Sequence, residues 1–247
     1  MPRQRKRQRR GSAGLIIAAV LVIGLPLLGW AGVNALTRDD TGDDSVAADD
    51  DSRTDAAGEA SRGEATGSFE IAQAARDTVN ACVDRLAAGD AYVASAGVGI
   101  GHWGEHVQAR TDMLNGTIAQ EDMKAIWKRT RLSGPDDVAQ ATAALEAYEA
   151  LPGCGDLATL EDAPDNVLDQ AAACLERETA MTTAVAASTA GLQDWANHLN
   201  AMAAHADGEM TAAAAQDLWV ASWEAAPANI GAYNDAHALL VAASACE

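Results

Sequence analysis

The stretch "ACVDR" at residues 81–85 recurs as "ACLER" at residues 173–177, and this recurrence decides how the chain is organised. When the sequence is shifted by 92 positions without a gap, the rarest residue types stay in one register over 73 residues. The pairs brought together are Cys82 with Cys174, Trp103 with Trp195, His106 with His198, Gly116 with Gly208, Trp127 with Trp219, Pro135 with Pro227, and Cys154 with Cys246. Because self-similarity at a fixed offset indicates repeated structural units, we predict a tandem duplication with repeats at 69–156 and 161–247.

Each predicted repeat is rich in alanine, the residue with the highest helix propensity. No segment alternates apolar and polar residues as a half-buried strand does. The first helices are expected at 74–94 and 164–188, and the second helices at 102–115 and 192–206. Gly116 and Gly208 follow the second helices, where a left-handed glycine commonly ends a helix. Glycines between residues 97 and 104 weaken the helical pattern before the second helix of the first repeat. The predicted fold class is all-α.

The third and fourth helices of each repeat are placed by their N-terminal signals. A threonine cap is expected to start the third helix, at Thr117 or in the next turn in one repeat and at Thr211 in the other. Proline suits the first turn of a helix, so Pro135 and Pro227 are expected to start the fourth helix. Four helices with short loops predict an up-down bundle in each repeat. The two bundles could pack side by side, or all eight helices could share one core.

The N-terminal region combines a basic tail with a long uncharged segment. Six bases and no acid lie in residues 1–12, and the 24 residues of 13–36 carry no charge. About 20 apolar residues span a bilayer, and flanking bases stay on the cytoplasmic side. We therefore expect residues 13–36 to form a single transmembrane helix in the lipid bilayer, with a cytoplasmic tail and an extracytoplasmic C-terminal part. A signal peptide cleaved after Ala35 is the alternative.

Acidic residues dominate everything that follows the predicted span. Residues 37–67 contain ten acids, three bases and no aromatic residue. Such a segment buries too little apolar surface to fold, so we expect a disordered acidic linker. The chain has a net charge of −19, and because residues 1–36 carry +6, the remaining 211 residues carry −25. A part this acidic repels polyanions, so nucleic acid is excluded as a partner.

The four cysteines of the chain are expected to form two disulfides, because the predicted location is outside the cytoplasm. All three possible pairings are compatible with twofold symmetry. In an up-down bundle the last helix returns beside the first, which favours Cys82–Cys154 and Cys174–Cys246. A metal-thiolate site is disfavoured because no Cys-x-x-Cys spacing is present.

The sequence "GHWGEH", residues 101–106, contains His102, Glu105 and His106 in the order H-x-x-E-H. This pentapeptide resembles the zinc site of the inverzincin metalloproteases. The second repeat has "QDWANH" at residues 193–198, which keeps only the tryptophan and the second histidine. The similarity implies a third distant carboxylate ligand and a mixed α/β fold, and neither is evident. We therefore do not predict a zinc protease.

A second pattern of histidine and methionine survives the comparison of the repeats. His106 and Met113 are seven residues apart on one helix, and His198 and His205 have the same spacing. Met202 lies on the same face as His198, four residues on. Histidine and methionine are ligands of copper and related ions, and bundle helices can carry such sites, so copper or haem is a candidate cofactor. The alternative is that these residues pack in the core.

The tryptophans and two arginines are interpreted as structural. Trp103 is expected to pack against Trp127, and Trp195 against Trp219, as the bulky centre of an alanine-rich bundle. They also leave open an aromatic ligand platform. Trp223 is expected at the surface, because Arg131 occupies the matching position. Arg85 and Arg177 are interpreted as helix-surface charges, with a buried arginine bound to a helix end as the alternative.

No nucleophile elbow, phosphate-binding loop or dinucleotide fingerprint occurs in the sequence. We therefore expect a non-enzymatic role as an envelope interaction or scaffold protein with an envelope protein as partner. The second hypothesis is a metal-binding or haem-binding envelope protein that uses His106, His198, Met202 and His205. An enzyme is the third.

Overall fold

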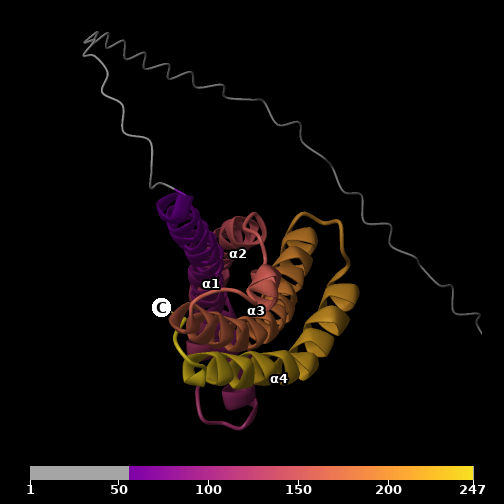
Figure 1. Cartoon of the computed structure of the whole chain (residues 1–247). Helices are drawn as coiled ribbons and strands as arrows, with labels where there is room; N and C mark the ends of the chain where they lie inside the picture. The colour runs from indigo at the N-terminus through magenta and orange to yellow at the C-terminus, as the bar shows by residue number, and fades with distance from the viewer. Residues whose placement is uncertain (1–55, 247) are drawn as a thin grey trace, which may run out of the picture. The chain divides into compact units, whose positions relative to one another are not determined.

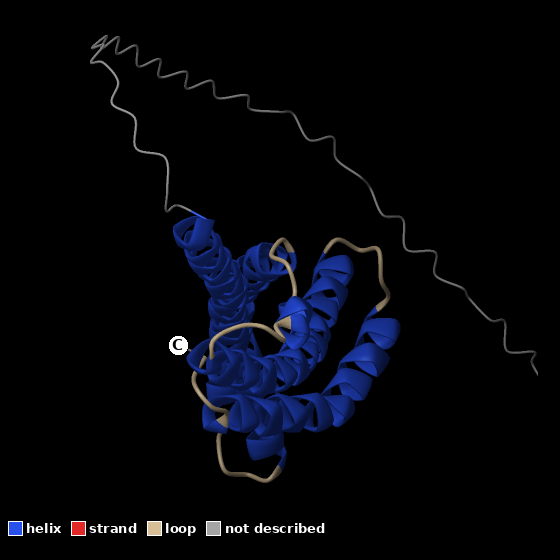
Figure 2. Cartoon of the chain, viewed as in Figure 1, coloured by secondary structure: helices blue, strands red, loops and turns tan. Residues whose placement is uncertain are grey.

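The computed structural model of the chain describes the backbone of residues 56–246 and the side chains of residues 69–246. This part contains four α-helices, one short 3-10 helix and no strand, as Figure 2 shows. The helices are α1 (Ala56–Leu114), α2 (Gln120–Glu149), η1 (Cys154–Thr159), α3 (Asp165–Ala206) and α4 (Ala212–Ala242). The predicted all-α class is confirmed for the described residues.

The four helices form two hairpins, α1–α2 and α3–α4, which pack on each other (Figure 1). Helices α1 and α3 lie against each other, α2 packs mainly on α1, and α4 packs mainly on α3. One hydrophobic core joins the hairpins, with Val79 and Tyr92 of α1 in the same cluster as Met181 of α3 and Leu240 of α4. The hairpins therefore share one core and do not form two separate bundles.

The predicted bundle of four helices in each repeat is wrong, because each repeat holds two long helices. Helix α1 continues without a break through the glycines between residues 97 and 104. A Cβ atom at Gly97 would overlap the hydroxyl oxygen of Tyr233, and one at Gly99 would lie 2.8 Å from the Leu192 side chain. These two glycines let neighbouring helices approach α1 closely, and they do not end it.

Proline does not start a helix in either hairpin, in contrast to the prediction. Pro135 lies inside α2, and Pro227 lies inside α4, which bends along its length (Figure 1). A proline in a helix interior loses one backbone hydrogen bond. Burial continues on both sides of Pro135, where Thr130 and Asp137 belong to the buried face of α2. Packing of the whole helix therefore outweighs the local cost of the proline.

The predicted left-handed glycines are confirmed. Gly116 has a φ of 73° and Gly208 a φ of 78°. The hydroxyl of Thr211 accepts a hydrogen bond from the Ala214 N–H and caps α4, as predicted. Helix α2 begins at Gln120 without a threonine cap, in the turn after Thr117.

Both predicted disulfides are present. Cys82 pairs with Cys154, and Cys174 pairs with Cys246, each across a sequence separation of 72 residues. The first bond ties η1 to the middle of α1, and the second ties the chain beyond α4 to α3. Each bond closes a loop that stabilises the fold by about 4 kcal/mol in the chain-entropy model.

Arg85 and Arg177 bind helix ends, so their interpretation as surface charges is wrong. The Arg85 guanidinium donates to the carbonyl oxygens of Tyr148 at 3.1 Å and Leu151 at 2.6 Å. Arg177 donates to the carbonyl of Leu240 at 3.4 Å. Each arginine thereby supplies donors to carbonyl groups at the C-terminal end of a helix, which lack partners within the helix.

The predicted tail at 1–12 and transmembrane segment at 13–36 lie outside the described residues. Helix α1 starts at Ala56, inside the predicted linker at 37–67, so residues 56–67 are helical and not disordered. Alanine, glutamate and arginine favour a helix there, and it continues into the packed part of α1. No helix in the described range 56–246 has both the length and the hydropathy to cross a bilayer.

Candidate ligand-binding site

A second, smaller core of aromatic residues lies where the two hairpins meet. Trp103 of α1 and Trp195 of α3 stack with ring centroids 5.3 Å apart, and their side chains are 1% and 0% exposed. Trp127 of α2 instead stacks on His106, at 5.1 Å. The expected pairing of Trp103 with Trp127 inside one hairpin is therefore replaced by a pairing of Trp103 with Trp195 between hairpins.

His106 and His198 face each other in this aromatic core. Their ring centroids are 5.0 Å apart with an edge-to-face arrangement, and both residues are buried. Burial lowers the pKa of His106 to about 3, with additional effects from His198 and Arg131. Burial also lowers the pKa of His198 to about 4. Both imidazoles are therefore neutral at pH 7, and each offers a nitrogen lone pair.

One ring nitrogen of His106 is paired within the first hairpin. Nδ1 lies 2.8 Å from the hydroxyl oxygen of Thr130, which also lies 3.0 Å from the carbonyl oxygen of Ile126. The Nδ1 atom of His106 is therefore held by α2 of its own hairpin.

The second hairpin lacks the hydrogen bonds that the first hairpin makes at the matching positions. The indole N–H of Trp127 donates to the carbonyl of His106 at 2.8 Å, whereas the indole nitrogen of Trp219 has no partner among the described residues. Nδ1 of His198 is likewise buried without a partner. The hydroxyl of Ser222, which matches Thr130, donates to the Leu218 carbonyl and leaves His198 unpaired. The histidine of the second hairpin therefore keeps one ring nitrogen without a partner among the described residues.

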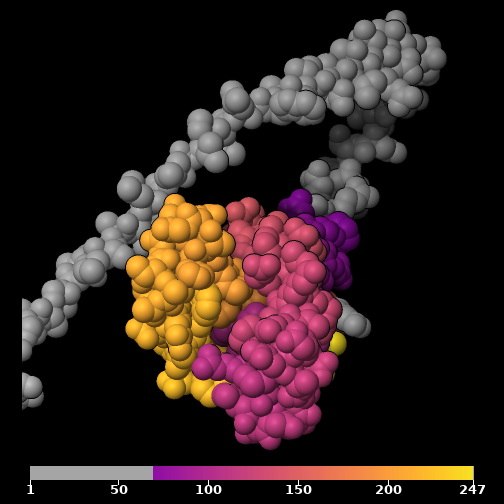
Figure 3. Space-filling model, turned by 180° about the vertical axis from the view of Figure 1, so that it is seen from behind, coloured from indigo at the N-terminus to yellow at the C-terminus, as the bar shows by residue number. Residues whose placement is uncertain are grey.

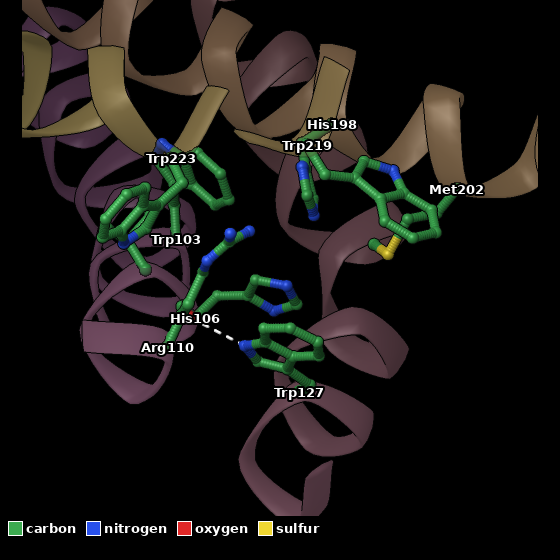
Figure 4. A pocket seen from close by; sticks show the side chains of 9 residues that line it. Trp103, His106, Arg110, Trp127, His198, Met202, Trp219 and Trp223 are labelled. Carbon is green, nitrogen blue, oxygen red and sulfur yellow. Dashed lines mark hydrogen bonds between the residues drawn. The ribbon is translucent and has the colours of Figure 1, made fainter. Parts of the chain in front are cut away.

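A cavity of about 180 Å³ lies between the hairpins at this point. It is lined by Trp103, His106, Val107, Arg110, Trp127, His198, Met202, Trp219 and Trp223. Figure 4 shows His106 and His198 on facing walls, with the Arg110 guanidinium and the Met202 sulfur pointing inward from opposite sides. In the space-filling view the two hairpins form neighbouring lobes with a seam between them (Figure 3). The walls are mainly aromatic, with four indole rings.

The cavity brings together three of the five predicted metal ligands. His106, His198 and Met202 line it, whereas Met113 and His205 do not. The His205 ring packs edge-on against Trp219 with centroids 5.6 Å apart, and its Nδ1 lies 3.2 Å from the Met210 carbonyl oxygen. A residue seven positions after each cavity histidine therefore lies too far along its helix to reach the cavity.

The three residues of the H-x-x-E-H pattern point to three different partners. Nδ1 of His102 lies 2.7 Å from the Asp137 carboxylate, and Glu105 accepts from Arg129 at 2.9 Å. Only His106 lines the cavity. The pattern therefore does not form one metal centre, and residues 193–198 also lack it.

Three residues of the cavity, Val107, Arg110 and Trp223, were not predicted as part of a site. Trp223 is half-buried, not at the surface, and its indole N–H donates to the Thr111 hydroxyl at 3.1 Å. The guanidinium of Arg110 lies over the Trp223 ring, 4.8 Å from its centroid. The shift of 92 positions could not find Trp223, because its matching residue is Arg131 and the signal relied on identical residue types.

Comparison of the chain with protein-family models, with curated proteins and with solved structures finds no match. The residues of the cavity, their burial and their unpaired polar atoms are therefore the features that indicate a function.

Proposed function

We propose that the helical domain binds one small aromatic or apolar molecule in the cavity between its hairpins. The supporting observation is a cluster of buried polar nitrogens without a partner among the described residues. These are Nε1 of Trp103, Trp195 and Trp219 and Nδ1 of His198. Native proteins pair nearly all buried polar groups. Three of the four belong to residues that line the cavity, and the fourth, Trp195, stacks on Trp103. Unpaired polar groups concentrated around one cavity support a binding site there.

The size and the walls of the cavity define the class of ligand. A cavity of about 150 Å³ with apolar walls is large enough for benzene, and this one measures about 180 Å³. Indole rings stack on flat rings in offset or edge-to-face geometry. The walls therefore suit a single aromatic ring.

Binding can be tested with the full-length chain in lipid nanodiscs, with empty nanodiscs as the blank. Titration with benzyl alcohol is expected to give saturable heat and a change in tryptophan fluorescence. Val107→Phe adds bulk to the cavity wall and is expected to abolish binding. Val98→Phe is the matched control, because Val98 is 56% exposed on the same helix. Absence of saturable binding to the unmodified chain would overturn the proposal.

A metal ion is the second candidate ligand of the cavity. Its support is the convergence of His106, His198 and Met202 on one cavity, with two neutral imidazoles 5.0 Å apart. Neutral imidazole and thioether suit Cu(I). The cavity of about 180 Å³ has room for a single ring and is too small for haem, so the metal candidate is an ion. A competition titration with a chromogenic Cu(I) chelator tests it, and equal affinity of the chain and its Met202→Leu variant would contradict it.

We propose that the two hairpins are copies of one ancestral unit, displayed outside the cytoplasm by an anchor at residues 13–36. The uncharged length of the segment and the bases before it support the anchor. The binding role proposed here is non-enzymatic and is compatible with an additional envelope protein partner. Fractionation of cells tests the anchor: the chain is expected to stay with membranes after an alkaline wash and to begin at its first residues. A soluble chain that begins at Leu36 contradicts it.

A further inference from the structure

A second, more open pocket adjoins the aromatic cavity. Its volume is about 250 Å³, and it shares His106, Trp127 and Met202 with the cavity. The remaining lining residues are Lys124, Lys128 and Arg131, which follow each other on α2. The shared residues make the pocket the mouth of the cavity, with an aromatic interior and a basic rim.

The positive charge of this rim is opposite to the net negative charge of the rest of the domain. Residues 69–247 contain 26 acids and only eight bases. Four of the eight bases line the cavity or its mouth, and no acid lines either of them. The four are Arg110, Lys124, Lys128 and Arg131. A patch of one sign concentrated around a concave site attracts ligands of the opposite sign.

Three of these four cations have no acidic partner. Arg110, Lys128 and Arg131 lie more than 4.0 Å from every carboxylate of residues 69–246, whereas Lys124 pairs with Glu121 at 3.1 Å. The neighbouring Arg129 pairs with Glu105 and lines neither pocket. Acids are abundant enough on this protein to pair such cations. Their absence around the mouth leaves the charges available to a ligand.

We infer that the ligand is a small aromatic acid, whose ring lies between the tryptophans while its carboxylate meets Lys128 and Arg131 at the mouth. This inference rests on the proposed function, because it uses the same cavity for the ring. In this arrangement the aromatic ring contacts indole rings, and the negative carboxylate contacts positive side chains. Charge-assisted hydrogen bonds to lysine and arginine are stronger than neutral ones, so the carboxylate supplies specificity as well as affinity. The same cations oppose the binding of a metal cation.

Three probes with one ring and different charge test the inference on the full-length chain in nanodiscs. Phenylacetate is an anion, benzyl alcohol is neutral and phenethylamine is a cation. Calorimetry at pH 7 is expected to give tightest binding for phenylacetate, about tenfold weaker binding for benzyl alcohol and the weakest for phenethylamine. Added salt should weaken phenylacetate binding and leave benzyl alcohol unchanged. Equal affinity for all three overturns the inference but preserves the proposed function, whereas no binding by any probe overturns both.

Variants on α2 separate the rim from general charge effects. Lys128→Gln and Arg131→Gln are each expected to weaken phenylacetate binding by about tenfold, with no change for benzyl alcohol. Arg129→Gln makes the same change of charge next to them, but its guanidinium pairs with Glu105 outside both pockets. Phenylacetate affinity should be unaltered in that variant. If Arg129→Gln weakens phenylacetate binding as much as Arg131→Gln does, the carboxylate is not held at the rim.

Discussion

His106 and His198, one from each hairpin, meet edge to face with ring centroids 5.0 Å apart in the aromatic core between α1 and α3. Their surroundings differ although their positions match. His106 binds Thr130 at 2.8 Å, whereas Nδ1 of His198 has no partner among the described residues. The pair is therefore asymmetric in its hydrogen bonds, and both histidines line the proposed ligand site.

The buried histidines predict a loss of stability in mild acid. The ordinary pKa of 6.5 is lowered to about 3 for His106 and about 4 for His198. Unfolding therefore takes up protons below pH 6.5, and the stability present above this pH is lost as the pH falls toward the folded-state values. From pH 7.5 to pH 5, each histidine should remove about 2 kcal/mol from the free energy of unfolding. Urea titrations across this range measure the effect.

A variant assigns this pH dependence to one residue. His198→Gln keeps a polar side chain of similar size and does not titrate, so it should remove about half of the slope between pH 5 and pH 6.5. His237→Gln is the control, because His237 stacks on Tyr233 at 5.7 Å, away from the cavity. An unchanged slope in His198→Gln would show that other groups cause the acid sensitivity.

The two disulfides are expected to contribute equally to stability, because each spans 72 residues. Replacing Cys82 and Cys154 together by alanine should lower the free energy of unfolding by about 4 kcal/mol, and so should replacing Cys174 and Cys246. Urea titration under non-reducing conditions measures both losses. Peptide mapping without reductant should recover the same two pairs from the unmodified chain, and any bridge between the hairpins would contradict the pairing.

Two glycines of α1, two residues apart, should respond oppositely to alanine. A Cβ atom at Gly99 would lie 2.8 Å from Leu192 and 3.2 Å from the Cβ of Asp137, whereas nothing lies within 4 Å of one at Gly101. Gly99→Ala is expected to destabilise the fold by about 1–3 kcal/mol. Gly101→Ala should stabilise it by about 0.5–1 kcal/mol, because alanine favours a helix interior. Thermal unfolding of the two variants measures these effects. Equal shifts of the melting temperature in both variants would refute close packing at Gly99.

Arg85 is expected to stabilise the C-terminal end of α2. Arg85→Met removes donors to the Tyr148 and Leu151 carbonyls and a guanidinium 4.0 Å from the Tyr148 ring centroid. Charged hydrogen bonds of this kind are worth about 1.5–3 kcal/mol, and the loss in urea titration should be of this size. Arg76→Met is the matched control, since Arg76 is exposed on the same helix. A comparable loss in both variants would mean that the bonds to α2 add nothing.

Local signals in the sequence were enough for the two helix ends at Gly116 and Gly208. Gly116 and Gly208 end helices because the left-handed conformation costs glycine little, whatever packs around them. Pro135 misled the prediction for the opposite reason. A proline favours a helix start locally, but here the buried residues on both sides keep α2 continuous. Segment boundaries at such positions depend on the neighbouring helix and not on the segment itself.

The sequence by itself determined the all-helical class and the left-handed caps, because composition and glycine conformation carry these features along the chain. The disulfide pairs also required the assumption that the last helix of each half returns beside its first. Only the tertiary structure decided which side chains meet. Trp103 stacks on Trp195 and His106 faces His198 across the hairpins. Periodicity assigns a residue to a face of its own helix, but the partner of that face depends on how two hairpins dock. The cavity and its basic rim are consequences of that docking.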